Sequence, residues 1–422
     1  MIKLNIVGSI FGNDGYSSHT RSLFNALYKQ KELDCKLVTQ LSQDWMQNVN
    51  DAELDAITKP DRKEDWNVIV TIPHMWKMFL GKGKNACYCV WEGDKIPKGW
   101  IEEFMNPRVD LILVPSQHTK QAIINTLIEK EEEIVIKKLI CIPHGVDRNI
   151  FYNQRKKDID DAQNVSISRD TKYVQSKTIK AEQVSGNVET HADTDALTNS
   201  VQNVEAVSRI DGRQFKFICN KGWRGTAWDR GGVQYLLKAY AEEFSKGENV
   251  QLIIKLNPAY INSQIIEQSV KQLNLSEDRA PIHINSDILS TLKLNELYNS
   301  ADCFVCATRG EAFNLPGLEA MSCGLPTIQT NFGGQVDYMN AENSLNIDYK
   351  LSESEEKPMY EGINWAVPDI NGLRKQLRFA FEHKDIIKKM GKQAEEDSKN
   401  WTWDNSANKL YKNISEHNGT NK

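Results

Sequence analysis

The feature that most constrains this 422-residue sequence is a predicted strand–loop–helix unit at residues 303–324. Its second half and the residues just after it, 309–326, read R-G-E-A-F-N-L-P-G-L-E-A-M-S-C-G-L-P. Apolar alternation over residues 303–307 predicts a buried strand. Pro316 suits the first position of a helix, and Gly324 suits the end of one. The sequence therefore predicts a crossover from the end of a strand into a helix.

Two carboxylates flank this junction, eight positions apart. Glu311 falls in the loop at the carboxyl end of the predicted strand, and Glu319 falls in the first turn of the predicted helix. Ligands of open α/β sheets bind at that edge. Two acids there can hold sugar hydroxyls while the amino terminus of the helix faces a phosphate. An ordinary crossover with acids on its surface is the alternative that spacing alone leaves open.

The other apolar segments predict an α/β fold with mostly parallel, doubly wound sheets in two domains. In residues 1–152 the predicted strands are residues 3–8, 68–72, 86–90, 111–114 and 139–142, with a helix at 18–29. In residues 213–400 the predicted strands are residues 215–219, 251–256 and 303–307, with helices at 231–244 and 292–300. Residues 369–413 are predicted to be helical.

Residues 153–212 differ sharply from the rest of the chain. They are rich in Ser, Thr, Asn, Gln, Asp and Lys, and Tyr173 is their only aromatic residue after the start. Such a segment buries little apolar surface, so we expect a disordered or loosely ordered insertion. Weak alternation of apolar and polar residues around Val165 and Val201 keeps an accessory hairpin as the alternative interpretation.

Composition argues against several classes of protein. The formal net charge of −5 gives no general reason to expect nucleic acid binding. No apolar run approaches the roughly 18 residues of a spanning helix, and the first residues lack a signal-peptide layout. Peripheral contact with a membrane stays open. Eight scattered cysteines, with no His or Cys cluster that completes a zinc set, lead us to expect no metal and a cytoplasmic setting.

The stretch around the two carboxylates resembles the E-x7-E signature of retaining glycosyltransferases with the GT-B fold, family 4 (glycosyl transferases group 1). F-x-L-P, L-E-A-M, C-G-L-P and the pair Gly333 and Gly334 are all in register with it. The chain departs from the usual signature at Ala312 and Asn314, where glycines are common. The resemblance covers roughly residues 1–152 and 213–415. It implies two Rossmann-like domains that face a central cleft.

A second segment, residues 220–240, resembles the strand–loop–helix in which this family binds the nucleotide diphosphate. Arg224 matches the family's Arg, and Arg230 stands where Lys is usual. Two guanidiniums and helix-terminal amides can stabilise the charge that develops on a leaving phosphate without a metal. A basic surface loop is the alternative interpretation of these residues.

The resemblance also assigns roles around the signature. It implies that Glu311 serves the donor sugar and that Glu319 serves the nucleotide ribose. The main-chain amides of Phe313, Asn314 and Leu315 are expected to face the sugar or the β-phosphate. Residues 287–289 are in the region where relatives contact the base, and nothing there distinguishes uracil from guanine.

In the first domain, the loop at residues 8–16 resembles the family's glycine loop, which approaches donor phosphate and acceptor. Gly12 and Gly15 are its candidate binding residues, and their spacing does not fit a dinucleotide fingerprint. Many relatives place a His near the acceptor, where this chain reads W-E-G-D at residues 91–94. His74 is a candidate substitute for that His. Glu92 and Asp94 are alternative candidates for contact with the acceptor.

Three further segments match the family. V-P-S-Q-H-T at residues 114–119 and I-P-H-G-V-D at residues 142–147 are expected to shape the cleft, with Ser116 at a helix cap. Residues 401–422 are expected to form a helix that crosses back onto the first domain.

The function that the resemblance implies is a metal-independent, retaining transfer of a sugar from a nucleotide diphosphate sugar, UDP- or GDP-linked, to an acceptor hydroxyl. The acceptor would be a sugar, a lipid-linked sugar or a glycan, and no cofactor is expected. In such front-face reactions the leaving phosphate helps to deprotonate the acceptor. Another GT-B enzyme, such as a sugar-nucleotide epimerase or an inverting transferase, and a non-catalytic sugar-nucleotide-binding protein are the alternatives, because fold alone does not decide function.

Overall fold

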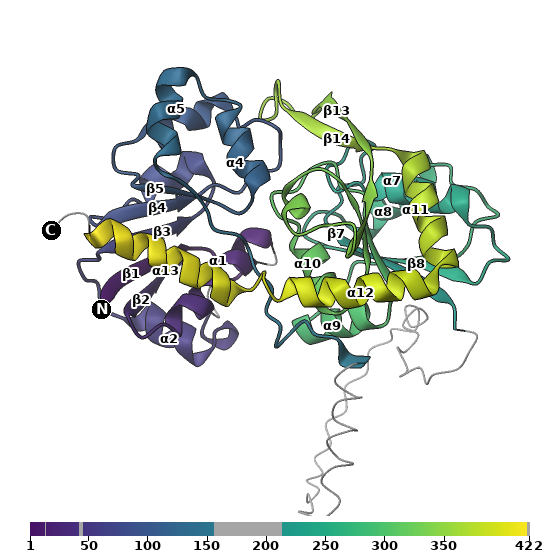
Figure 1. The fold of residues 1–422 in the computed structure, drawn as a ribbon, viewed down its shortest axis with the longest axis horizontal. Helices are drawn as coiled ribbons and strands as arrows, with labels where there is room; N and C mark the ends of the chain where they lie inside the picture. Colours follow the sequence, from purple (N-terminus) through teal and green to yellow (C-terminus); the bar gives the residue numbers. More distant parts are fainter. Residues whose placement is uncertain (13, 42–44, 156–212, 420–422) are drawn as a thin grey trace, which may run out of the picture. The chain divides into compact units, whose positions relative to one another are not determined.

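A computed structural model describes residues 1–12, 14–41, 45–155 and 213–419. The first domain is built on a six-stranded sheet in the order β2-β1-β3-β4-β5-β6, and all neighbouring strands are parallel (Figure 1). Its strands are β1 (Ile2–Gly8), β2 (Leu33–Val38), β3 (Trp66–Val70), β4 (Lys84–Tyr88), β5 (Leu111–Val114) and β6 (Leu139–Cys141). Its helices are α1 (Gly15–Tyr28), α2 (Asp51–Thr58), α3 (Ile101–Met105), α4 (Gln117–Ile124) and α5 (Glu129–Ile136), with short 3-10 helices η1 (Trp45–Asn48), η2 (Pro73–Met78) and η3 (Lys98–Trp100).

The second domain repeats this plan with a parallel sheet in the order β12-β11-β10-β7-β8-β9. Its strands are β7 (Phe215–Lys221), β8 (Val250–Leu256), β9 (Ile282–Asn285), β10 (Cys303–Cys306), β11 (Thr327–Thr330) and β12 (Ser344–Ile347), and an antiparallel hairpin follows as β13 (Tyr349–Glu353) and β14 (Asn364–Pro368). Its helices are α7 (Val233–Glu243), α8 (Ser263–Gln272), α9 (Thr291–Asn299), α10 (Leu315–Ser322), α11 (Ile370–Glu382) and α12 (Lys384–Ser398), with the 3-10 helix η4 (Gly334–Asp337). The last helix, α13 (Trp403–Gly419), follows α12 in the chain. The predicted α/β fold with two Rossmann-like sheets is confirmed.

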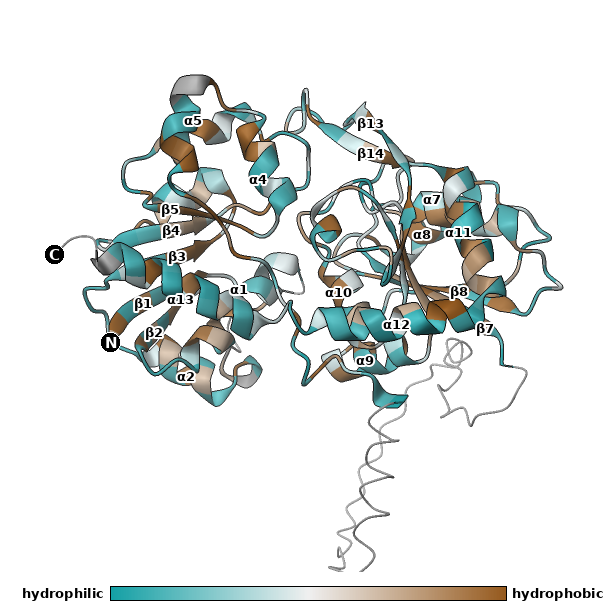
Figure 2. Cartoon of the chain, in the orientation of Figure 1, coloured by the Kyte–Doolittle hydropathy of each residue, from teal (hydrophilic) through white to brown (hydrophobic). Residues whose placement is uncertain are grey.

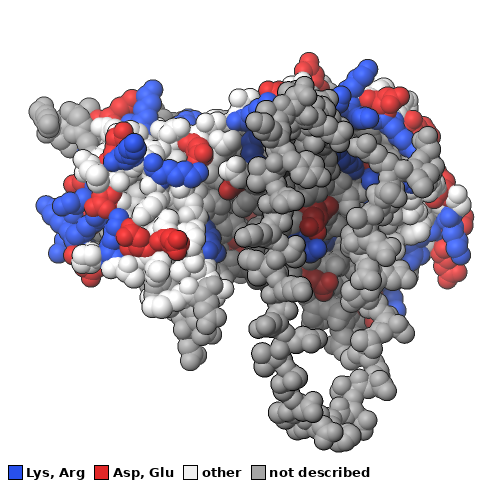
Figure 3. Space-filling model, turned by 90° about the horizontal axis from the view of Figure 1, so that it is seen from below, with Lys and Arg blue, Asp and Glu red and all other residues white. Residues whose placement is uncertain are grey.

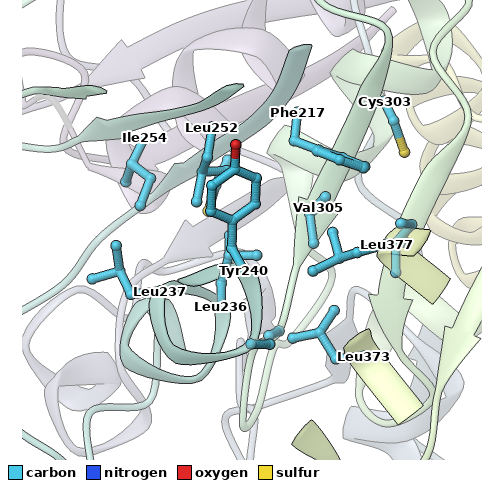
Figure 4. Close-up of a cluster of buried hydrophobic side chains, with 14 of the residues drawn as sticks. Phe217, Leu236, Leu237, Tyr240, Leu252, Ile254, Cys303, Val305, Leu373 and Leu377 are labelled. Atoms are coloured by element: carbon cyan, nitrogen blue, oxygen red, sulfur yellow. The ribbon is translucent and has the colours of Figure 1, made fainter. Parts of the chain in front are cut away.

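The core of the second domain shows why its strands were recognisable from sequence. Side chains of β7, β8 and β10, Phe217 among them, form one apolar cluster with side chains of α7 and α11 that include Tyr240 and Leu377 (Figure 4). These residues are fully buried. Many residues along the strands of the parallel sheet are brown, whereas the helices show brown on one side and teal on the other (Figure 2). This is the pattern expected of a parallel sheet with helices on both faces: its strands are almost continuously apolar, and each helix buries one apolar stripe.

The last two helices serve different domains. α12 packs against α10 and α11 of the second domain, while α13 packs against α1 of the first (Figure 1). Ala407, Leu410 and Ile414 of α13 are fully buried in the apolar cluster of the first domain. The chain therefore crosses back to the first domain between Ser398 and Trp403.

The β13–β14 hairpin also contacts the first domain. Tyr360, Ile363 and Trp365 belong to an apolar cluster that is otherwise built from the first domain, and the Tyr360 ring stacks on Trp91 with centroids 4.8 Å apart. Asn364 donates to the Asp94 carboxylate from its backbone N–H (2.7 Å) and from its side-chain amide (2.8 Å). The hairpin thus fixes the loop at residues 91–95 beside the second domain.

One predicted helix starts at a different residue than expected, and one predicted segment lies outside the described residues. α10 begins at Leu315, so Pro316 takes its second position and Glu319 falls in its second turn rather than its first. The interpretation of residues 153–212 falls almost wholly outside the described residues. In the described part of the chain, no helix combines the length and apolar character needed to cross a membrane.

Candidate functional site

A cavity of about 1050 Å³ is lined by residues from both domains. From the second domain it is lined by the loops that follow β7 and β10, and from the first by the loop after β1 and one side of α1. β7 and β10 are neighbours in the sheet at the point where the strand order reverses. Crevices at such switch points are where open α/β sheets bind ligands.

The cavity wall is centred on a buried ion cluster. The Glu311 carboxylate lies 2.6 Å from the Lys221 ammonium and 3.0 Å from the Arg230 guanidinium. The Lys221 side chain is 7% exposed and that of Glu311 is 14% exposed. Burial alone would raise the pKa of Glu311, but the positive charges of Lys221 and Arg230 hold this pKa below its ordinary value. Glu311 is therefore a carboxylate with two cations beside it, at the edge of the cavity.

Asn314 explains one departure from the usual signature. Its backbone is left-handed (φ 64°), a conformation that glycine and, next to it, asparagine adopt most readily. Its buried side chain accepts from Lys221 Nζ at 3.3 Å and donates to Gln329 Oε1 at 2.6 Å. Asn314 therefore keeps the backbone shape that a glycine would allow and adds a hydrogen bond that holds Lys221.

Glu319 lies in a different environment. Its carboxylate accepts from the Tyr298 hydroxyl at 2.9 Å, and Tyr298 in turn accepts from Asn220 at 2.9 Å. Burial raises the pKa of Glu319 to about 7, and the hydrogen bond from Tyr298 offsets only part of this effect. Glu319 lines the cavity with Leu315 and Pro316, at the amino-terminal end of α10.

Both arginines of the predicted pair line the cavity, but their partners differ. Arg230 contacts Glu311, as described, whereas Arg224 lines the cavity with a 55% exposed side chain and pairs with Glu356 at 3.2 Å. The second cation beside Glu311 is Lys221, which was not among the sequence candidates. Lys221 ends β7 and is buried like Phe217 and Cys219 before it, but a lysine at the end of a predicted strand does not by itself indicate a site.

The remaining donor-side candidates divide between cavity and core. Gly12, Gly15 and Leu315 line the cavity. Phe313 is instead packed in the core, where its ring contacts His144 and Tyr338. Its backbone amide therefore remains a predicted contact, while its side chain has a packing role.

The acceptor-side candidates lie outside the cavity wall. His74 is exposed on η2 and is not among the residues that line the cavity. Glu92 and Asp94 are also outside that set, and both hold contacts with the second domain. The loop at 114–119 has the expected cap, since Ser116 accepts the backbone N–H of Thr119 at the start of α4.

Charge is distributed evenly on the face shown in Figure 3. Lys and Arg residues there are interspersed with Asp and Glu over the coloured surface, so no broad patch of one sign is seen on it. Among the described residues, no group of three or more His, Cys, Asp or Glu side chains is arranged to hold a metal ion.

Residues 222–356 match the family model described as glycosyl transferases group 1. A curated relative, alpha-maltose-1-phosphate synthase of Mycolicibacterium smegmatis, is 28% identical over 147 residues. The match covers 34% of this chain and 37% of that protein, so the chain matches it over well under half of its length.

Solved structures resemble the chain over nearly its whole length. A glycosyltransferase from Rickettsia africae has a TM-score of 0.62 at 13% identity and 98% coverage of both chains. HepE of Anabaena has a TM-score of 0.62 at 11% identity, covering 99% of this chain and 100% of that one. Sucrose-phosphate synthase of Thermosynechococcus elongatus has a TM-score of 0.61 at 14% identity and full coverage of both. At these identities the likeness shows a shared GT-B fold, and together with the family match it supports the prediction of a glycosyltransferase.

Proposed function

We propose that this protein is a retaining glycosyltransferase of the family 4 type, which transfers a sugar from a nucleotide diphosphate sugar to an acceptor hydroxyl without a metal. The observation that carries the proposal is the ion cluster of Glu311, Lys221 and Arg230 at the cavity wall. The family match at residues 222–356 contains all of these residues except Lys221.

The cluster suits the departure of a diphosphate. Cleavage of the sugar–phosphate bond leaves negative charge on the β-phosphate, and preorganised cations stabilise charge best where it develops. Arg230 offers a planar fork and Lys221 a compact charge, so together they can hold a phosphate through several hydrogen bonds. Glu311, held ionised between them, can accept hydrogen bonds from hydroxyls of the donor sugar.

Glu319 suits the ribose. It lies in the second turn of α10, on the same cavity wall, and an ionised carboxylate there can accept hydrogen bonds from ribose hydroxyls. Ile288 and Leu289 also line this side of the cavity and offer apolar surface for the base. The solved complexes of HepE contain UDP with glucose, or UDP-glucose, which favours a UDP-sugar over a GDP-sugar as the donor here.

The acceptor side is polar. Ser18, Ser22 and Asn25 of α1 line the cavity opposite the second domain. Hydroxyl and amide groups of this kind bind sugar hydroxyls through neutral hydrogen bonds. We therefore propose a sugar or glycan as the acceptor. In a front-face reaction the leaving phosphate takes the proton of the attacking hydroxyl, so no protein base is required.

The setting is proposed to be the reducing cytoplasm. All eight cysteines are free and buried, whereas disulfides are the usual state of paired cysteines in oxidising compartments.

A panel of UDP-, GDP- and ADP-sugars tests the donor by thermal shift. A donor at about 100 times its dissociation constant adds about 2.7 kcal/mol to the free energy of unfolding, which raises the melting temperature measurably. We expect a UDP-sugar to give the largest shift and to release UDP when a mixture of oligosaccharide acceptors is added. No shift from any sugar nucleotide would overturn the proposal. NMR of the anomeric proton in the product then decides between retention and inversion.

A further inference from the structure

Glu92 connects the first domain to the ion cluster. It follows β4 of the first domain, yet its Oε1 lies 3.2 Å from Nε of Arg230 in the second domain. The same oxygen accepts a hydrogen bond of 2.6 Å from the Tyr360 hydroxyl, which comes from the β13–β14 hairpin. Arg230 is therefore held between two carboxylates, Glu311 from its own domain and Glu92 from the other.

The backbone of Glu92 is fixed by the first domain. His118 Nε2 is hydrogen-bonded to the Glu92 carbonyl at 3.0 Å, and Thr119 Oγ1 donates to the Trp91 carbonyl at 2.7 Å. Both partners lie in the first turn of α4. This arrangement gives a structural reason for the motif at residues 114–119 that family resemblance assigned to the shape of the cleft.

The contacts of Arg230 define the plane of its guanidinium. Nε meets Glu92, while Nη1 donates to the Gly310 carbonyl at 2.7 Å and to Glu311 at 3.0 Å. Arginine binds phosphate through a fixed fork of donors, so the orientation of that plane decides how well the fork matches a phosphate. Two partners on different edges determine this orientation more fully than Glu311 alone.

Glu92 contacts Arg230 but does not itself line the cavity. It is mostly buried, it is absent from the cavity lining, and its Oε1 is already shared by Arg230 and Tyr360. Its influence on a bound diphosphate must therefore pass through Arg230.

We propose that Glu92 is a positioning residue that orients Arg230 from across the domain interface, so that the diphosphate site is complete only when the first domain is engaged. The inference rests on the proposed function, in which Arg230 binds the diphosphate of the donor. It adds that the acceptor-side domain contributes to the donor site through a side chain that never contacts the donor.

The test is a double-mutant cycle between Glu92→Gln and Arg230→Ala, with full-length protein. Calorimetry with UDP and with GDP gives the affinity, and release of nucleoside diphosphate from the matching sugar nucleotide gives kcat and KM. Glu92→Gln keeps an oxygen for Tyr360 but weakens the contact with Arg230. We expect kcat to fall roughly tenfold, since small misplacements of catalytic groups carry penalties of this size. The free diphosphate should also bind more weakly, because a misaligned Arg230 presents its donors less well to the phosphate.

Asp94→Asn is the matched control. Asp94 lies on the same loop and also binds the hairpin, through Asn364, but none of its hydrogen bonds is to Arg230. Asp94→Asn removes one negative charge from the same interface as Glu92→Gln does. A general loosening of that interface would therefore lower kcat equally in the two variants. We expect near wild-type kcat in Asp94→Asn.

The cycle separates this inference from the proposed function. If Glu92 acts through Arg230, Glu92→Gln produces no further loss in the Arg230→Ala background. Three outcomes would each overturn the positioning role. The first is a full additional loss of kcat when Glu92→Gln is added to Arg230→Ala, and the second is wild-type kcat in Glu92→Gln. The third is an equal loss of kcat in Glu92→Gln and Asp94→Asn. Unchanged affinity and turnover in Arg230→Ala, or no binding of either diphosphate to the wild-type protein, would instead overturn the proposed function.

Discussion

Single residues show how burial and charge shift the pKa values of two nearby carboxylates in opposite directions. Glu311 and Glu319 belong to one short segment, but only Glu311 has cations within 3.0 Å, and its pKa is below the ordinary value. Glu319 has a hydroxyl donor instead, and burial raises its pKa to about 7. Pairs of acids whose environments push their pKa values apart commonly have distinct roles at functional sites.

This difference predicts a pH dependence of nucleotide binding. The folded-state pKa of Glu319 lies above that of an unfolded chain, so near neutral pH the free protein carries a partly protonated Glu319. Ribose hydroxyls donate to the carboxylate form, so binding favours proton release. We expect UDP affinity, measured by calorimetry, to rise as pH increases through about 7 and to level off above it.

Comparison with Glu319→Gln isolates the contribution of the protein, because the terminal phosphate of UDP itself titrates near pH 6. The variant should keep only the part of the pH dependence that belongs to the phosphate. Identical pH profiles for both proteins would contradict the assignment of Glu319 to the ribose.

Asn314 offers a second test at the residue scale. Both Asn314→Gly and Asn314→Ala remove the hydrogen bonds to Lys221 and Gln329, but only alanine must place a Cβ in the left-handed region. We expect alanine to lower the free energy of unfolding by about 1 kcal/mol more than glycine. Chemical denaturation of the two variants measures this difference, and a more stable alanine variant would show that the backbone at 314 is not constrained as described.

At the scale of elements, strands and helices could be predicted from the sequence where they bury either one face or all of their side chains. β5 matches its predicted residues, and β1, β4 and β8 were found within two residues at each end, because their apolar runs are covered on both faces. β2 was missed since Lys36 interrupts its pattern, and this lysine is buried in the strand and paired with Asp61. The β13–β14 hairpin was missed because the exposed residues of β13 give no apolar alternation.

The site followed the same rule. Glu311, Glu319 and Arg230 were predicted together because they belong to a contiguous signature or a loop beside a predicted helix. All three line the cavity, and their roles stay predictions. Lys221 was missed because a lysine in a buried strand has meaning only when its partner, Glu311 from a distant loop, is known. The contact between Glu92 and Arg230 joins residues 138 positions apart in the sequence, so no pattern of local hydrophobic periodicity could predict it.

The crossing between the two domains predicts the effect of a glycine substitution. Val146 donates to the Trp401 carbonyl at 2.9 Å, and a Cβ at Gly145 would lie 2.2 Å from the backbone nitrogen of Trp403. Gly145→Ala must therefore separate the two chain segments, and we expect a loss of at least about 2 kcal/mol in the free energy of unfolding, as for overpacked cores.

Gly247→Ala is the control for this substitution, because a Cβ at Gly247 meets no atom within 4 Å. Urea unfolding should leave that variant within about 0.5 kcal/mol of wild type, as is usual for surface positions. Equal stability of the two variants would mean that the segments at 145 and 403 do not pack as closely as the structure shows.

Across the whole molecule, one polar chain links the two domains through the site. It runs from Gln329 through Asn314, Lys221, Glu311 and Arg230 to Glu92. Its two cations are balanced by two carboxylates, so an arriving diphosphate meets charges that are already oriented. Such preorganisation is the main way in which enzymes stabilise charge that develops during a reaction.

This arrangement predicts that activity persists without divalent metal. The charge that a metal would supply at the leaving diphosphate is provided here by Lys221 and Arg230, as proposed. Turnover of the sugar nucleotide should be unchanged, within about twofold, when excess EDTA is added. Complete loss that manganese or magnesium restores would contradict metal independence and leave the sugar-nucleotide site itself to be tested separately.

The central claim is that the cluster around Glu311 turns over a nucleotide diphosphate sugar, and the release of nucleoside diphosphate tests it most directly. The measurement compares wild type with Glu311→Gln, using the sugar nucleotide that most raises the melting temperature. The substitution preserves shape but weakens charged hydrogen bonds worth about 1.5–3 kcal/mol. We predict release by the wild type, and a 10- to 100-fold lower kcat in the variant with nearly unchanged binding of the free diphosphate. No release by the wild type, or equal kcat in both proteins, would contradict the claim.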